Sequence, residues 1–289
     1  MADGKVTIET ELDSKGAEQG VSKLGAGLKK VGSVAGAGLK AVGAASIAAG
    51  TAIVALGKKS VNLYADYEQL FGGVETLFGK SGDRLMKYAN EAYKTAGLSA
   101  NEYMETVTSF SASMIKSLGG DTKKAADYSN QALIDMSDNA NKMGSNMQDI
   151  QNAYQGFSKQ NYTMLDNLKL GYGGTQAEMQ RLLKDAEKLT GQKYDISSFS
   201  DITQAIHAIQ TEMGITGTTS KEAATTIQGS AGMMKASFEN FLTGMADPEQ
   251  DFDMLLGNLI DSIVTFADNL IPRIQEMLPR LIEGINQLI

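Results

Sequence analysis

The segment Asn167–Leu183, NLKLGYGGTQAEMQRLL, runs from a glycine-rich stretch straight into an expected helix. A phosphate-binding loop would need a preceding strand, the pattern G-x-x-x-x-G-K-[ST] and a lysine for the phosphates. The segment has none of these, and Thr175 and Glu178 instead have the spacing of a capping box. We therefore expect a helix that ends at Gly191, preceded by a backbone turn that requires positive φ angles. The turn residues are Gly171, Gly173 and Gly174.

Helix signals continue on both sides of this turn. Ser99–Glu102 is a capping box that predicts a helix to about Leu118, and Asp121 or Thr122 is expected to start the next helix. Further boxes begin at Ser145 and Thr219, and the second of them predicts one helix running past Phe238. With short connections and no strand pattern, residues 60–246 are expected to form an all-α core domain.

Composition narrows the chemistry that the chain can support. The 289 residues are 42% hydrophobic, with 0 Cys, 1 His and 0 Trp. Disulfides and thiolate metal sites are therefore excluded. The chain also has no second histidine or cysteine with which its one histidine could complete a metal site or a catalytic triad. His207, between Ile206 and Ile209, is expected to be a structural histidine. We expect no enzyme activity, no catalytic residue, no cofactor and no metal.

A short polar region contains a group of aromatic residues that could stack on nucleic-acid bases. Only Lys159 and Lys169 lie close to them in sequence, so packing within the helical domain is the better interpretation. We expect no specific nucleic-acid recognition. The aromatic residues are Tyr154, Phe157, Tyr162 and Tyr172.

Residues 1–14 and 15–59 have different patterns. Val6, Ile8 and Leu12 alternate with polar residues, which predicts one short N-terminal strand at 1–14. The Gly/Ala-rich arm at 15–59 has apolar or small residues at heptad spacing, which is typical of a seam between helices. The bulky members of this seam are Val21, Leu24, Leu28, Val31, Val42 and Leu56.

Within the arm, residues 41–57 carry no charge and precede Lys58 and Lys59. A membrane span needs about 20 apolar residues, so this run is slightly short. Three interpretations stay open: a helix ordered by oligomerisation or by its surroundings, a marginal membrane span, and a flexible arm. The first is favoured. The candidate membrane residues are Val42, Ile47, Ile53, Val54 and Leu56.

Residues 247–289 are expected to form an amphipathic helix that continues in a longer chain. Asp247 should cap it, with Pro248 at its first position. Pro272 and Pro279 lie one heptad apart and should bend the helix twice in the same direction. Its apolar seam contains Ile260, Val264, Ile271, Ile274, Leu278, Leu281 and Ile285.

Charge is distributed unevenly along the chain. Residues 15–59 contain seven lysines against Glu18 alone, a balance of +6. Residues 246–289 contain eight acidic residues against two arginines, a balance of −6. A basic arm can bind a polyanion or a membrane surface, although solvated helix faces explain the same pattern.

The segment Ala140–Leu189, ANKMGSNMQDIQNAYQGFSKQNYTMLDNLKLGYGGTQAEMQRLLKDAEKL, resembles the core of phage tail tape-measure proteins. The order of the surrounding segments is also similar to that family. The N-terminal strand leads into the arm GLKKVGSVAGAGLKAVG and then YEQLFGGVETLFG, and DNLIPRIQEMLPRLIEGI follows the core. Family members are usually much longer, and nothing here matches the peptidoglycan-cleaving domain that some carry.

This resemblance implies a structural protein of a phage tail or phage-tail-like particle. Parallel helical copies would lie in the tail lumen and set tube length, with tail-tube protein and tail assembly chaperones as partners. The chain would be made in the host bacterial cytoplasm, and it would leave the tube ahead of the DNA, with the host membrane as a further partner in genome ejection. The alternative hypothesis is a membrane-active, pore-forming or channel-forming helical protein.

Overall fold

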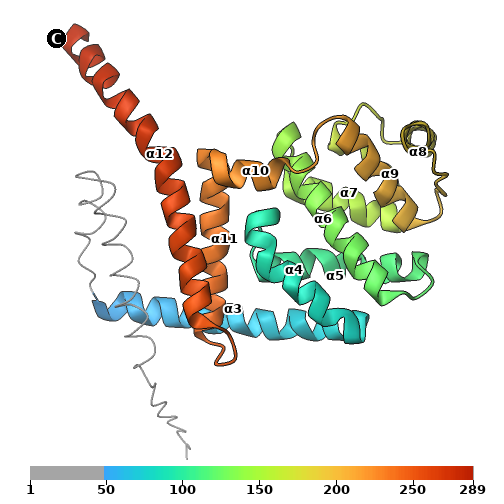
Figure 1. Cartoon of the computed structure of the whole chain (residues 1–289), viewed down its shortest axis with the longest axis horizontal. Helices are drawn as coiled ribbons and strands as arrows, with labels where there is room; N and C mark the ends of the chain where they lie inside the picture. Colours follow the sequence, from blue (N-terminus) through green and yellow to red (C-terminus); the bar gives the residue numbers. More distant parts are fainter. Residues whose placement is uncertain (1–48, 289) are drawn as a thin grey trace, which may run out of the picture. The chain divides into compact units, whose positions relative to one another are not determined.

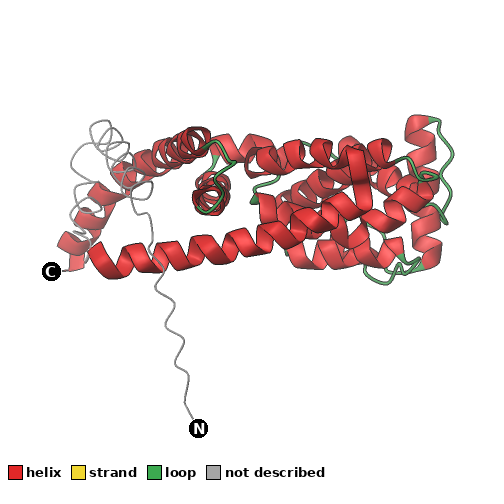
Figure 2. Ribbon diagram, turned by 90° about the horizontal axis from the view of Figure 1, so that it is seen from below, coloured by secondary structure: helices red, strands yellow, loops and turns green. Residues whose placement is uncertain are grey.

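The computed structural model describes the backbone of residues 49–288 and the side chains of residues 56–280. The chain divides into two units, Met1–Gly50 and Thr51–Ile289, and the described side chains all belong to the second. Every regular element in the described residues is helical, which confirms the expected all-α class (Figures 1 and 2). The predicted strand at 1–14 lies outside these residues.

The helices follow one another with short connections. In chain order they are α3 (Ala49–Phe78), η2 (Gly79–Ser81), α4 (Gly82–Thr95), α5 (Ala100–Ser117), α6 (Thr122–Met143), α7 (Met147–Ser158), η3 (Leu165–Leu168), α8 (Gln176–Thr190), α9 (Phe199–Glu212), α10 (Thr218–Thr225), α11 (Ile227–Met245) and α12 (Phe252–Leu288). Helices α4 to α7 and α9 surround a common core, α8 packs on α9, and α12 lies along α11 (Figure 1).

Several helix starts confirm the sequence prediction. Ser99 and Glu102 form a complete capping box at α5, and the Asp121 side chain accepts the Lys124 amide at α6. Such caps satisfy amide donors that have no partner inside the helix. At α7 the prediction of Ser145 is wrong by one residue, because Asn146 caps the helix while the Ser145 hydroxyl donates to the Asn167 carbonyl at 3.2 Å.

The helix expected from Thr219 past Phe238 is interrupted. Helix α10 begins after Gly217 and ends before Thr226, whose side chain then caps α11 by accepting the Gly229 amide at 2.9 Å. A Cβ atom at Gly229 would collide with the Glu222 carbonyl, so glycine permits this sharp change of direction.

The glycine-rich turn before α8 is a turn, but its glycines serve different purposes. Gly171 has φ +85°, as expected. Gly173 and Gly174 do not have positive φ angles, which corrects the prediction for both. A Cβ atom at Gly174 would collide with the Thr163 carbonyl, so this position requires glycine because two backbone segments approach closely.

Thr175 caps α8 by accepting the Glu178 amide at 3.2 Å. The Glu178 carboxylate accepts the Gly173 amide at 3.1 Å rather than the Thr175 amide, because the Thr175 amide already donates to the Gly173 carbonyl. Gly191 ends the helix with φ +72°, as predicted.

At both ends of the expected core domain, the helix boundaries in the structure differ from those predicted from the sequence. The division between 59 and 60 falls inside the continuous helix α3. Asp247 and Pro248 form a turn and not a helix start, since the Asp247 carboxylate accepts the Glu249 amide. The cap of α12 is Asp251, which accepts the Met254 amide at 3.0 Å.

Aromatic side chains fill much of the core. Tyr154, Phe157 and Tyr162 are buried, with ring centroids 5.7 Å apart for the first pair and 6.3 Å for the second. Phe110 and Phe199 meet edge to face at 5.8 Å. These rings therefore pack the helical domain, as expected, and burial of this area is the main stabilising contribution.

Candidate interaction surface

Helix α12 covers the outer side of α11 with one of its faces. Leu256, Leu259 and Ser262 are buried against the domain, and the rings of Phe241 and Phe252 are 5.2 Å apart. Farther along, the Asn269 amide donates to the Ala224 and Thr226 carbonyls at 3.3 Å each. Among the described side chains, these are the hydrogen bonds between α12 and the domain that lie nearest to the C-terminal end of α12.

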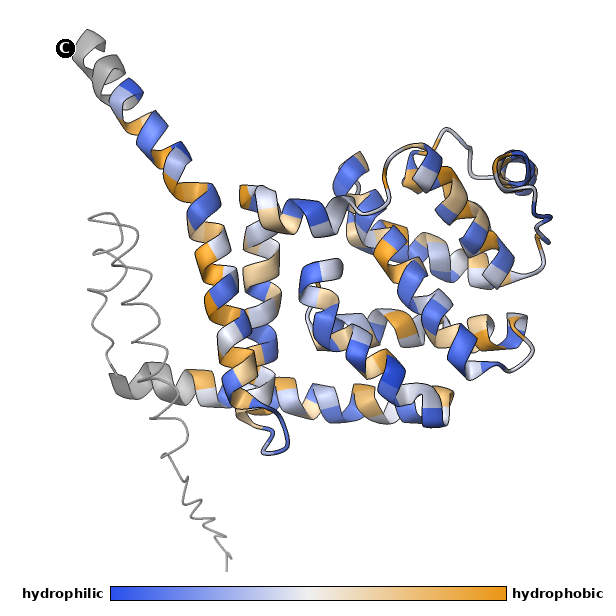
Figure 3. Cartoon of the chain, viewed as in Figure 1, coloured by the Kyte–Doolittle hydropathy of each residue, from blue (hydrophilic) through white to orange (hydrophobic). Residues whose placement is uncertain are grey.

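A second face of α12 stays uncovered. Of the predicted seam, Ile260 and Ile271 are partly exposed, while Val264 is 36%, Ile274 39% and Leu278 50% exposed. Apolar residues follow α12 beyond its contact with α11 (Figure 3). We call Ile260, Val264, Ala267, Ile271, Ile274 and Leu278 the α12 stripe.

The remaining seam and membrane residues can be placed only in part. Ile53, Val54 and Leu56 lie in α3, and the Leu56 side chain is 37% exposed. Leu281 and Ile285 belong to α12 by their backbone. The other predicted residues, Val21, Leu24, Leu28, Val31, Val42 and Ile47, lie outside the described part of the chain.

Helix α12 also has the length and composition of a membrane-crossing helix. Within Phe252–Arg280, a stretch of 29 residues, an 18-residue window reaches a mean hydropathy of 1.3, and 17% of that window is buried. Within the described residues, no other helix meets this criterion. Core helices of soluble proteins can pass the same test, but they are mostly buried, unlike this one.

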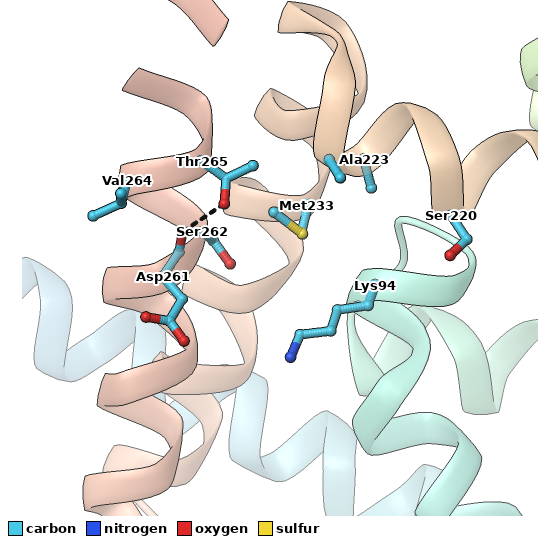
Figure 4. A pocket seen from close by; sticks show the side chains of 9 residues that line it. Lys94, Ser220, Ala223, Met233, Asp261, Ser262, Val264 and Thr265 are labelled. Carbon is cyan, nitrogen blue, oxygen red and sulfur yellow. Dashed lines mark hydrogen bonds between the residues drawn. The ribbon is translucent and has the colours of Figure 1, made fainter. Parts of the chain in front are cut away.

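A pocket of about 500 Å³ lies beside the α12 stripe (Figure 4). Lys94 of α4 reaches toward it from one wall, and Asp261 of α12 lies on the opposite wall. Lys94 also packs over the Tyr93 ring at 5.2 Å, and its pKa is raised chiefly by a hydrogen bond with Tyr93. No ion pair joins the Asp261 carboxylate to a cation in the described residues.

Helix α10, which leads into α11, is anchored by a side chain from α6. The Asp138 carboxylate is fully buried and accepts two backbone amides, from Gly217 at 2.6 Å and from Thr219 at 2.7 Å. Asp138 therefore caps α10 from another helix, since Gly217 at the N-cap has no side chain to do so. The charge also lies favourably at the positive end of the helix dipole.

Two further polar side chains of α6 fix other segments. Asn139 is buried and donates to the Leu168 carbonyl at 2.9 Å, which holds the loop after α7. Asp135 is buried beside His207 of α9, with 2.8 Å between Asp135 Oδ1 and His207 Nδ1. We call Asp135, Asp138 and Asn139 the α6 polar row.

Burial raises the pKa of the Asp135 carboxyl to about 6, while the hydrogen bond with His207 acts in the opposite direction. The same hydrogen bond raises the pKa of His207. The contact with a buried carboxylate of α6 was not anticipated from the sequence.

Sequence reasoning missed the α6 polar row because Asp and Asn in a helix usually face water. The spacing of the three residues was the sequence signal that could have predicted their burial. Asp135, Asp138 and Asn139 recur at three and four residues, like Leu133 and Met136, so they continue a buried face.

The described side chains contain no group of three or more His, Cys, Asp and Glu residues arranged to hold a metal ion. Comparisons with protein-family models, curated proteins and solved structures find no match.

Proposed function

We propose that this chain is a structural tape-measure protein of a phage tail or a phage-tail-like particle. In this role helical copies lie lengthwise in the tail lumen, tail-tube protein assembles around them with the help of assembly chaperones, and their length sets tube length. The sequence resemblance over Ala140–Leu189 supports the proposal. We assign no catalytic residue, because a ruler acts through its dimensions.

The observation that carries the proposal is the uncovered stripe on a long helix. Helix α12 has 37 residues, and at 1.5 Å per residue it extends roughly 55 Å. From Pro272 to Arg280 its side chains are exposed, so this part projects from the domain with apolar residues on one face. Exposed apolar stripes of this kind are typical of surfaces that associate.

Tail length in particles that carry altered chains tests the ruler. An insertion of four heptads between Glu276 and Met277 preserves the phase of the stripe, and it should lengthen tails by about 42 Å per 28 residues. An equal insertion in the loop at Gln192, between α8 and α9, should leave the length unchanged. Lengths are measured by electron microscopy of purified particles. Tails of equal length in particles with the unaltered chain, the α12 insertion and the Gln192 insertion would exclude the ruler role.

A second candidate function is membrane activity, which the composition of Phe252–Arg280 favours. Burying a carboxylate in hydrocarbon is expensive, so Ile274→Glu and Leu278→Glu should reduce binding of the chain to lipid vesicles. Gln275→Glu is the matched control, because it adds the same charge beside the stripe. Vesicle flotation and dye leakage measure the effect. Absence of binding by the unsubstituted chain would exclude this function.

A further inference from the structure

We propose that the pocket between α4, α10, α11 and α12 binds a linear ω-amino acid group, in which an unbranched aliphatic chain joins a primary ammonium to a carboxylate. The pocket has a volume of about 500 Å³, within the range of sites that hold small molecules. Its two charged side chains, Lys94 and Asp261, lie on opposite walls (Figure 4). We call it the Lys94–Asp261 pocket.

The α12 wall of this pocket offers hydrogen-bond acceptors. The Asp261 carboxylate forms no hydrogen bond and no ion pair within the described part of the chain. The Thr265 hydroxyl donates to the Asp261 carbonyl at 2.9 Å, and the Ser262 hydroxyl donates to the Asn258 carbonyl at 2.7 Å. Because both hydroxyl hydrogens are engaged, these side chains present only oxygen lone pairs. A primary ammonium, which has three donors and no acceptor, matches this wall.

The opposite wall offers hydrogen-bond donors. The Lys94 ammonium has donors only, and among the described side chains it has no ion-pair partner. It lies over the Tyr93 ring, with 5.2 Å between Nζ and the ring centroid, which holds it beside the pocket. The Ser220 hydroxyl lines the pocket from α10, and no described residue forms a hydrogen bond with it. An ionised carboxylate, which only accepts, matches this wall.

The surface between the two charged side chains is apolar. Met233 of α11 lies between Lys94 and Asp261 in Figure 4. Met233 and Ala223 belong to a small buried cluster with Tyr93 and Ala236, so this part of the lining is fixed by packing. Contact with it removes an aliphatic chain from water, which is favourable. The lining therefore has acceptors, apolar surface and donors in the order that an ω-amino acid requires.

A ligand with one charge fits this lining less well. It would bring apolar surface against the pocket while either Lys94 or Asp261 kept no counter-charge, and partial removal of water from an unpaired charge is costly. A ligand with an ammonium at one end and a carboxylate at the other compensates both walls. Since no direct ion pair joins Lys94 and Asp261 across the pocket, the ligand replaces no existing contact between them.

Isothermal titration calorimetry of the full-length chain with ε-aminocaproate tests the proposal. We expect a dissociation constant on the order of 1 mM, as for a small ligand held by two charged contacts. Caproate has no ammonium and hexylamine has no carboxylate, so each should bind roughly tenfold more weakly. Absence of binding by ε-aminocaproate, or equal binding by the three compounds, would overturn the proposal.

The same chemistry has two sources, a free ω-amino acid and the C-terminal lysine of a polypeptide. The tripeptide Gly-Gly-Lys and its C-terminal amide distinguish them in the same titration. Tighter binding of the tripeptide than of ε-aminocaproate, lost in the amide, would identify a polypeptide end as the ligand. Weaker binding of the tripeptide would identify a free small molecule.

Substitutions locate the ligand in the pocket. Lys94→Gln and Asp261→Asn should each weaken binding of ε-aminocaproate by about tenfold, because each removes one charged contact. Lys87→Gln on α4 and Asp268→Asn on α12 are the matched controls, since both side chains are exposed and neither lines the pocket. Equal affinity in all four variants would place the ligand elsewhere and overturn the assignment.

Two further changes separate charge from shape. Ala224→Leu keeps both charges but fills part of the pocket, so it should abolish binding in a sample whose circular dichroism matches the unsubstituted chain. Lys94→Glu alone or Asp261→Lys alone puts like charges on both walls and should also abolish binding. The two reversals together should restore it, because the ligand can bind in the opposite direction. Failure of this rescue would contradict the assigned charges. Tail lengths test the ruler role independently of this pocket.

Discussion

At the scale of single residues, the α6 polar row connects segments that are distant in the chain. Asp138 fixes α10, Asn139 fixes the loop after α7, and Asp135 meets α9 through His207. Buried polar groups stabilise a unique arrangement only when their partners are present, since an unpaired group in the core is costly. The row therefore orients helices whose apolar faces could pack in several ways.

Removing the Asp138 carboxylate should destabilise the domain by about 2–4 kcal/mol, because two buried amides lose a charged acceptor. Asp138→Ala is measured by chemical denaturation, together with hydrogen exchange at the Gly217 and Thr219 amides. Asp138→Asn retains one acceptor oxygen and should lose roughly half as much. Equal stability of Asp138→Ala and the unsubstituted chain would mean that α10 has another cap.

The Asp135–His207 pair should make stability fall as pH rises. Both pKa values are raised in the folded state, so the folded chain holds protons that the unfolded chain releases. The contribution of Asp135 to the free energy of unfolding is present below pH 3.8 and is lost by about pH 6. The contribution of His207 to the free energy of unfolding is lost as the pH rises above 6.5.

Asp135→Asn should remove most of this dependence. The free energy of unfolding of the unsubstituted chain, relative to that of Asp135→Asn, should decrease between pH 5 and pH 8 by roughly 1–3 kcal/mol. Asp66→Asn, on the exposed side of α3, is the control for the loss of one carboxylate. If the free energy of unfolding of the unsubstituted chain, relative to that of Asp135→Asn, increased with pH, the assigned direction of the two pKa shifts would be contradicted.

At the scale of elements, local chemistry explains which predictions succeeded. The starts of α5, α6 and α8 follow from caps within a few residues of the helix, so the sequence contains all the information needed. The break between α10 and α11 was missed although the Thr226 cap of α11 is local; only the anchor of α10, Asp138, comes from a distant part of the chain. The cap of α12 was misplaced to Asp247, although Asp251 has the same chemistry four residues later.

The turn before α8 gives a prediction at this scale. Gly174→Ala should destabilise the domain by about 3 kcal/mol, since its Cβ atom would collide with the Thr163 carbonyl. Gly171→Ala should cost about 1 kcal/mol through its positive φ. Gly173→Ala is the control, because its Cβ atom would make an ordinary 3.5 Å contact with Glu178. Thermal unfolding of the three variants gives the order, and an equal loss at all three would contradict it.

At the scale of the whole described unit, the sequence predicted the α12 stripe but not which face of α12 the domain covers. Leu256 and Leu259 pack on α11, while Val264 and Ile274 remain uncovered. Heptad spacing reveals that a face is apolar, but it does not reveal the partner, because the partner depends on tertiary contacts. Self-association through the stripe accordingly stays a prediction.

Ile274→Asp with Leu278→Asp should shift the full-length chain toward monomer, because charges in a helix seam are costly to bury. Sedimentation velocity over a range of concentrations measures the change, and we expect a rise in the apparent dissociation constant of about tenfold or more. The control is Gln275→Asp, which adds a negative charge beside the stripe and leaves its apolar residues in place. Identical sedimentation of all three chains would remove the stripe from association.

The cap that Asp138 supplies to α10 has a mechanical consequence. Helices α10, α11 and α12 follow one another, with Thr226 the single residue between the first two. A pull on α12 reaches the domain through α11, where the Asn240 side chain accepts the Ala100 amide at 2.7 Å, and through α10, where the Asp138 carboxylate accepts two amides. Under tension these polar contacts should break before the aromatic core yields, so α10 to α12 can be drawn out while the rest of the domain keeps its shape.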